Sequence, residues 1–190
     1  MRSNSTVKLT PKAALLVPSM LRIPAQLTSG VRPAERMNIR PATAADANAI
    51  SSLIAETAHH FMLHPSGRGA ERFLEGISPQ AIAGYVASPS YYYLVAVSGP
   101  EVVGAVALRD GRHLFHLFVA PNRQRQGIAR ALWSAAMKGA APDLEALTVN
   151  SSPNAVVVYE KFGFTPTGSR TEMHGIAFIP MKAAVLARQT

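Results

Sequence analysis

Residues 117–130 combine features that suit a binding site for a phosphate group. An apolar, strand-like run leads into a polar basic loop, and a helical pattern begins at about Gln126. The first N–H groups of a helix have no partner within it and lie at the positive end of its dipole, so they attract anions. Gly127 lets a ligand approach the backbone, and Ala129 keeps a nearby position small.

Three arginines, Arg123, Arg125 and Arg130, add positive charge to this loop. No Gly-Lys-Ser/Thr follows, so the loop is not a Walker motif. It has one glycine where a dinucleotide fingerprint has three. Two interpretations remain: a phosphate or pyrophosphate cradle of another kind, or a basic loop that caps an ordinary helix.

A second segment, residues 148–164, is predicted to form a strand, a polar turn and a short amphipathic helix. Gly163 suits a helix stop in the left-handed conformation. Tyr159 lies on the helix, one turn before this stop. Taken alone, the segment is equally a helix with an aromatic staple at its end.

Together the two segments resemble the GNAT superfamily of N-acetyltransferases. Gln124-x-x-Gly127-x-Ala129 is similar to the acyl-CoA signature of that family, and Pro121 stands six residues before the glycine, as is usual there. Residues 155–164 resemble the family's second motif, an alanine-led helix with Tyr-Glu-Lys that ends in Gly-Phe. The resemblance covers Met37 to about Leu186.

The resemblance implies acetyl-CoA as the acetyl donor and assigns roles to residues of both segments. The strands before the two motifs separate in the family, and the pantetheine arm lies between them. The implied cofactor contacts are Leu117, Phe118 and Val119 for the pantetheine arm, and Gln124, Arg125, Gln126, Gly127, Ile128, Ala129 and Arg130 for the pyrophosphate. The Val119 N–H is implied as the oxyanion donor, and Tyr159 as the acid that protonates the departing thiolate.

One position departs from the family pattern. Many members carry an asparagine three residues before the alanine of the second motif, and Ser152 stands there instead. Asn150 and Asn154 flank it and are the alternative cofactor contacts.

The general base is not defined by the motifs. The signature strand offers His113 and His116 and no acid. Either histidine would accept the proton of the amine, directly or through water, and would titrate near pH 6–7.5. The alternative for each is a strand histidine without a catalytic role. Strand alternation puts the two on opposite faces unless a β-bulge intervenes.

The acceptor is expected to bind between Phe61–Ile77 and the final hairpin, as in the family, where Arg68, Glu71 and Arg72 would select its charge. No cysteine is present, which excludes disulfides and thiolate metal sites. His60 and His64 have the spacing of helical metal ligands, but the helix should end before both can share an ion. We therefore expect no metal.

The elements that position these residues are predicted from Met37 onward. We expect an α/β (α+β) fold of the GNAT type, in which a mixed, mostly antiparallel central sheet of about seven strands has helices on both faces. The order is βααβββαβαββ. Thr43 with Asp46 predicts a capping box, and Ser78-Pro79 predicts another helix start. The last two strands are expected at about 164–169 and 176–181.

Composition and charge predict one folded domain, residues 37–190, after an extension at 1–36 that is disordered or precedes the native start. The net charge is +8, and six basic residues against one acidic residue lie in the extension. The remaining +3 is ordinary for an enzyme that binds a polyphosphate, so we expect neither nucleic acid nor membrane as a partner.

The predicted function is the transfer of an acetyl group to a primary amine of an unidentified small molecule or peptide, by direct attack in a ternary complex. The alternative is a non-catalytic module that senses acyl-CoA. A cytoplasmic location is the default for such a chain, and the family resemblance leaves a homodimer open.

Overall fold

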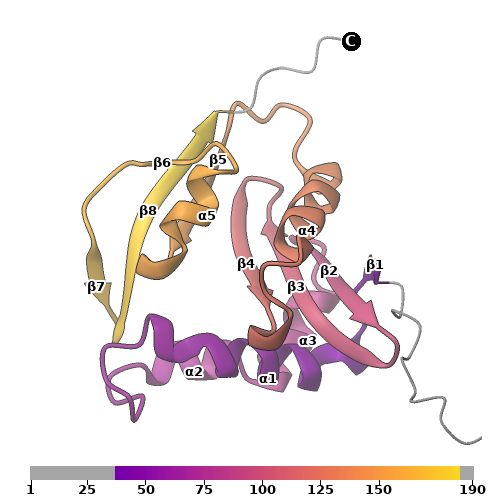
Figure 1. Ribbon diagram of the computed structural model, residues 1–190, viewed down its shortest axis with the longest axis horizontal. Coiled ribbons are helices and arrows are strands. Elements are labelled where there is room, and N and C mark those ends of the chain that lie inside the picture. Colours follow the sequence, from indigo (N-terminus) through magenta and orange to yellow (C-terminus); the bar gives the residue numbers. More distant parts are fainter. Residues whose placement is uncertain (1–36, 185–190) are drawn as a thin grey trace, which may run out of the picture. The chain divides into compact units, whose positions relative to one another are not determined.

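The structure, a computed structural model, describes residues 37–184. The predicted extension at 1–36 lies outside the described residues. Eight strands form the sheet in the order β1-β2-β3-β4-β5-β8-β6, and β7 pairs with β8 (Figure 1). The strands are β1 Asn38–Pro41, β2 Tyr91–Ser98, β3 Glu101–Arg109, β4 His113–Val119, β5 Ala146–Ser151, β6 Thr165–Pro166, β7 Thr171–Met173 and β8 Ile176–Ala184.

The α-helices are α1 Ala47–Thr57, α2 Glu71–Gly76, α3 Pro79–Ala87, α4 Ile128–Ala136 and α5 Val156–Glu160. Neighbouring strands are antiparallel except β4 and β5, which run parallel. The predicted fold class, a mixed and mostly antiparallel sheet, is therefore confirmed.

Two details of the predicted element order differ from the structure. The segment expected as one strand at 164–169 contributes only β6, and a separate strand, β7, follows it. Pro166 cannot donate a ladder hydrogen bond, and Gly168 stabilises a strand poorly, so β6 ends at Pro166, and beyond it the Thr167 N–H still donates to β8, to the Pro180 carbonyl at 2.9 Å. A short helix that the predicted order leaves out, α2 at Glu71–Gly76, makes the order βαααβββαβαβββ.

Helices cover both faces of the sheet because the strand side chains alternate. On β3, Val106 and Leu108 pack in the core that contains Ile128 and Leu132 of α4. The neighbouring β3 side chains, Ala105 and Ala107, pack in a second core with Ile50 and Leu53 of α1 and Ile82 of α3. Tyr159 of α5 belongs to the first core, so α4 and α5 share one face and α1 and α3 cover the other.

Asp46 joins β1 to the start of α1. Its carboxylate accepts hydrogen bonds from the Thr43 N–H at 2.7 Å and from the Thr43 hydroxyl at 2.9 Å. The Arg40 guanidinium donates to both of its oxygens at 2.8 Å. These bonds, led by the bond to Arg40, hold the pKa of Asp46 well below its usual range. The predicted capping box is present at this helix start.

We predict that Asp46→Asn lowers the free energy of unfolding by about 2 kcal/mol at pH 7, because charge-assisted hydrogen bonds to a buried group are lost. Since the folded pKa of Asp46 is depressed, its stabilising effect is fully present above the unfolded pKa of about 3.9 and is lost progressively as pH falls from there through the depressed folded pKa. Urea unfolding of the mutant and the wild type should therefore show a smaller difference at about pH 2 than at pH 7. Asp110→Asn, at an exposed ion pair of 3.9 Å, is the matched control and should change stability by less than about 0.5 kcal/mol. An equal difference at both pH values would contradict the assigned role.

Candidate active site

The centre of the sheet opens between β4 and β5. The two strands pair at only two positions, His113 with Thr148 and Leu114 with Val149. Figure 1 shows them diverging beyond this point. The C-terminal half of β4 therefore has a strand neighbour on one side only, β3.

The backbone of β4 turns alternate groups toward this opening. The Ala120 N–H donates to the Val103 carbonyl of β3 at 3.0 Å. Because backbone groups alternate along a strand, those of Val119 and Leu117 point away from β3, toward the gap. The Val119 carbonyl accepts a hydrogen bond from the Gln124 side chain at 3.2 Å, and the Val119 N–H points to the same side of the strand, away from β3. An extended ligand can pair with this edge.

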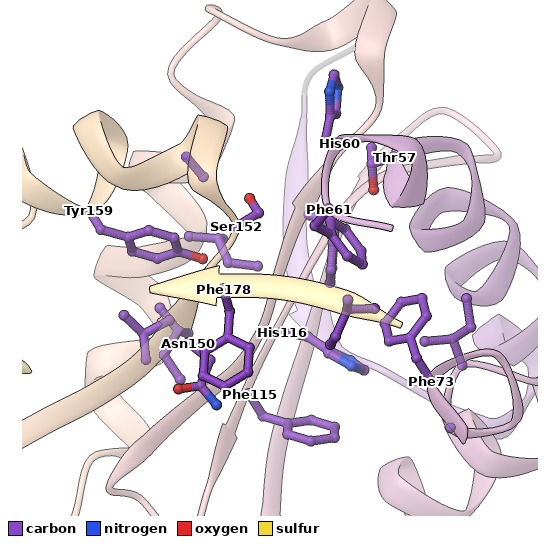
Figure 2. Close-up of a pocket in the computed structure, with 18 of the residues that line it drawn as sticks. Thr57, His60, Phe61, Phe73, Phe115, His116, Asn150, Ser152, Tyr159 and Phe178 are labelled. Atoms are coloured by element: carbon purple, nitrogen blue, oxygen red, sulfur yellow. The ribbon is translucent and has the colours of Figure 1, made fainter. Parts of the chain in front are cut away.

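A cavity of about 580 Å³ lies at the opening. Figure 2 shows part of its lining, with Tyr159, Asn150 and Ser152 facing Phe61 and His116 across it. The predicted site residues that line the cavity are Leu117, Phe118, Val119, Gln124, Asn150, Ser152, Asn154, Tyr159, His113 and His116. The structure thus brings residues of both motifs around one space.

The expected pyrophosphate cradle lies at the start of α4. Gly127 precedes the helix with φ 81°, and Arg125 has φ 61°, so the loop turns sharply and α4 begins at Ile128 rather than at Gln126. The first bond within the helix joins the Ala131 N–H to the Gly127 carbonyl, so the N–H groups before it point outward. Among the predicted pyrophosphate contacts, Gln124 lines the cavity. The others do not: Arg125, Gln126, Gly127, Ile128, Ala129 and Arg130.

The positive charge at the cradle comes mainly from two arginines. Arg123 pairs with Glu101 at 3.2 Å. Arg125 and Arg130 are exposed and have no carboxylate partner in the described part of the chain. These two side chains are available to an anionic group.

Tyr159 is the buried residue of α5 and is 7% exposed. Its ring packs edge-on against Phe164, with centroids 5.7 Å apart. Burial raises the pKa of its phenol, so the hydroxyl stays protonated at neutral pH. Figure 2 shows the hydroxyl directed into the cavity.

His116 lies after a β-bulge in β4. Leu108 pairs with Leu114 and Ala107 pairs with His116, so Phe115 is the extra residue. His116 Nδ1 lies 2.8 Å from the Tyr93 hydroxyl. Burial lowers the pKa of His116 to about 3, so the imidazole is neutral and does not titrate near pH 6–7.5 as its sequence context predicts.

His113 lies at the closed end of the gap, and its Nδ1 is 2.8 Å from the Thr148 hydroxyl. Burial, and then the positive charge of Arg109, lower its pKa to about 4. The bulge removes the strict alternation between the two histidines, and both line the cavity.

Sequence reasoning missed much of the cavity wall. Four aromatic residues, Tyr85, Tyr91, Phe115 and Phe178, line it together with Arg109, although the tyrosine run at 91–93 is typical of ordinary strand packing. The four rings come from separate elements, so they are seen to form one wall only once the fold brings these elements together.

Of the three residues expected to select acceptor charge, Arg72 lines the cavity and Arg68 and Glu71 do not. Glu71 instead accepts a hydrogen bond from the Gly69 N–H at 2.9 Å. Within residues 37–184, no three His, Cys, Asp or Glu side chains gather in a way that suits a metal ion.

Known proteins share this architecture. The acetyltransferase (GNAT) domain family matches residues 61–185, about two thirds of the chain, and the protein belongs to this family. It is accordingly an acetyl-CoA-dependent acyltransferase. A search among curated protein sequences finds no match. No helix among the described residues is long and apolar enough to cross a membrane.

Solved structures confirm the fold at low sequence identity. A PaiA N-acetyltransferase from Thermoplasma acidophilum, solved with coenzyme A, is 15% identical with a TM-score of 0.61 over 79% of this chain and 99% of its own. A GCN5-related N-acetyltransferase from Rhodopseudomonas palustris is 20% identical with a TM-score of 0.61 over 82% of this chain and 100% of its own.

We predict that Gly127→Glu abolishes acetyl-CoA binding, because a carboxylate would occupy the space in front of the α4 N–H groups. A Cβ at Gly127 meets no atom within 4 Å, so the folding cost is the left-handed backbone strain alone, about 1–2 kcal/mol. Gly127→Ala carries the same strain without the charge and should retain most of the affinity. Calorimetric titration with acetyl-CoA measures the affinity of both variants. Unchanged affinity in a folded Gly127→Glu protein would show that the pyrophosphate does not bind at the start of α4.

Proposed function

We propose that the protein is an N-acetyltransferase that moves an acetyl group from acetyl-CoA to a primary amine of a small molecule or peptide by direct attack in a ternary complex. One observation carries the proposal: the open backbone edge of β4 and the hydroxyl of Tyr159 face the same cavity. These are the groups needed to hold a thioester and to protonate its leaving group.

The donor is proposed to lie along the β4–β5 gap. The backbone of Leu117, Phe118 and Val119 and the side chains of Asn150, Ser152 and Asn154 would contact its pantetheine arm. Its pyrophosphate would bind the α4 N-terminus beside Arg125 and Arg130. The helix dipole and the outward N–H groups support this orientation, since the cofactor is anionic at that end.

The reaction forms a C–N bond and breaks a C–S bond. The amine attacks the thioester carbonyl, whose oxygen becomes negative and accepts a hydrogen bond from the Val119 N–H. Collapse of this intermediate releases the thiolate, which takes a proton from Tyr159. A phenol with a raised pKa is fully protonated at neutral pH, so Tyr159 can donate without first being charged.

The proton of the attacking amine is proposed to leave through water. His116 and His113 have depressed pKa values and are neutral throughout the physiological range. Tyr93 has a strongly raised pKa, remains protonated and can donate to His116 Nδ1, which leaves Nε2 to carry its own proton. The two imidazoles are proposed to orient the amine or its water rather than to store the proton.

We predict that Tyr159→Phe lowers kcat 10²–10⁴-fold, the usual effect of losing a general acid, while acetyl-CoA affinity survives because the ring remains. The chemical step with any working amine, measured in single turnover, provides the test. Tyr92→Phe, at an exposed ring outside the cavity, should behave as wild type. A Tyr159→Phe rate within about threefold of wild type would leave Tyr159 only a packing role.

The pH profile of kcat/KM should lack an ionisation near pH 6–7.5 and should rise until the acceptor amine itself is deprotonated. The reason is the sign of the histidine shifts: with pKa values of about 3 and about 4, both imidazoles are already neutral above pH 5. His116→Ala should lower kcat/KM without moving this profile. An ionisation near neutral pH that His116→Ala removes would instead identify His116 as the base.

A further inference from the structure

Phenylalanine rings from four separate elements line the cavity. Phe61 follows α1, Phe73 lies on α2, Phe115 on β4 and Phe178 on β8. Phe61 and Phe73 meet edge-on with centroids 5.1 Å apart. Figure 2 shows all four rings around the same space. An acceptor that enters here would contact a largely apolar, aromatic wall.

The charged side chains that line the cavity are all basic. No aspartate or glutamate lines it, whereas Arg72 and Arg109 do. Arg109 lies 3.9 Å from Asp110 and stacks over the Phe115 ring at 5.7 Å. Arg72 has no carboxylate within 4 Å among residues 37–184, and its nearest polar contact is His174 Nε2 at 3.5 Å.

The nearby acids do not supply a negative charge to the cavity. Glu71 binds the Gly69 N–H, and Glu172 pairs with Arg170 on β7 and its preceding turn. Glu75 is exposed and does not line the cavity. A polyamine or another polycation would bring further positive charge beside Arg72 and Arg109, with no carboxylate among the residues that line the cavity to balance it, which is unfavourable.

We propose that the acceptor is an amine with an apolar, ring-sized body and a carboxylate, as in a free aromatic amino acid. Its body packs among the phenylalanine rings, and its carboxylate pairs with Arg72 across the cavity mouth formed by α2 and the β7–β8 turn. A zwitterion of this kind is neutral overall, so it avoids the repulsion that excludes polycations. The inference rests on the proposed acetyl transfer and names its substrate class.

The reaction balances with this acceptor. The amino nitrogen forms an amide bond to the acetyl carbon, and the C–S bond of the donor breaks. The sulfur gains a proton from Tyr159, and the proton that the amine loses leaves through water, from which the Tyr159 hydroxyl is restored. A peptide N-terminus fits less well because its neighbouring carboxylate is already consumed in the peptide bond. The pantetheine arm shares the cavity of about 580 Å³, which leaves room for a small acceptor.

The experiment compares L-phenylalanine, L-phenylalaninamide and spermidine with the full chain and acetyl-CoA. We expect kcat/KM for L-phenylalanine to exceed that for the amide at least tenfold, although the amine of the amide is less basic and more of it is unprotonated. Arg72→Gln should remove this preference. Arg68→Gln, a neighbouring arginine that does not line the cavity, should retain it.

Binding of the same three compounds to the protein saturated with coenzyme A, measured by calorimetry, separates the two proposals. Carboxylate-dependent binding that Arg72→Gln abolishes, without turnover, would support the substrate class and overturn acetyl transfer. Equal or better turnover of the amide or spermidine would overturn the substrate class and leave acetyl transfer in place. If L-phenylalanine neither binds nor reacts, the proposed class is wrong.

Discussion

The divergence of β4 from β5 is the constraint on which the rest of the site depends. Two strands that paired along their full length would satisfy each other's backbone groups and leave no space. Here pairing stops after Leu114, so the N–H and carbonyl groups of the following residues need other partners. The Gln124 side chain donates a hydrogen bond to the Val119 carbonyl, and the other backbone groups of this edge face the cavity. Helices α4 and α5, packed in one core, cover the same face on either side of the opening.

Much of the fold could be predicted because its signals are local. The capping pair of Thr43 and Asp46 and the Ser78 cap of α3 each involve residues a few positions apart. Gly99 and Gly111 lie in the tight turns that join β2 to β3 and β3 to β4, where their φ values are positive, and such turn glycines are likewise a local signal. The two motifs were also recognisable because each is a continuous stretch of chain. Gln124 and Tyr159, one from each motif, line one cavity in the structure, and the roles given to them are proposals.

What could not be predicted depends on contacts between distant segments. His116 bonds to Tyr93, 23 residues earlier, and its low pKa follows from burial that no local pattern reveals. The aromatic wall gathers Phe61 and Phe178 from opposite ends of the domain. The hairpin around β7 was also mispredicted, because Pro166 and Gly168 end one strand without indicating that another begins at Thr171.

The extra residue in β4 gives the two halves of this strand different sequence requirements. After Phe115, Leu117 packs toward one core and Phe118 toward the other, in regular alternation. At the bulge, Phe115 and His116 both turn toward the aromatic side. A substitution at Phe115 would therefore reshape the aromatic side of the cavity without changing the register of Leu117 and Val119 against β3. The side chains that one strand presents to the cavity can in this way vary independently of its backbone edge.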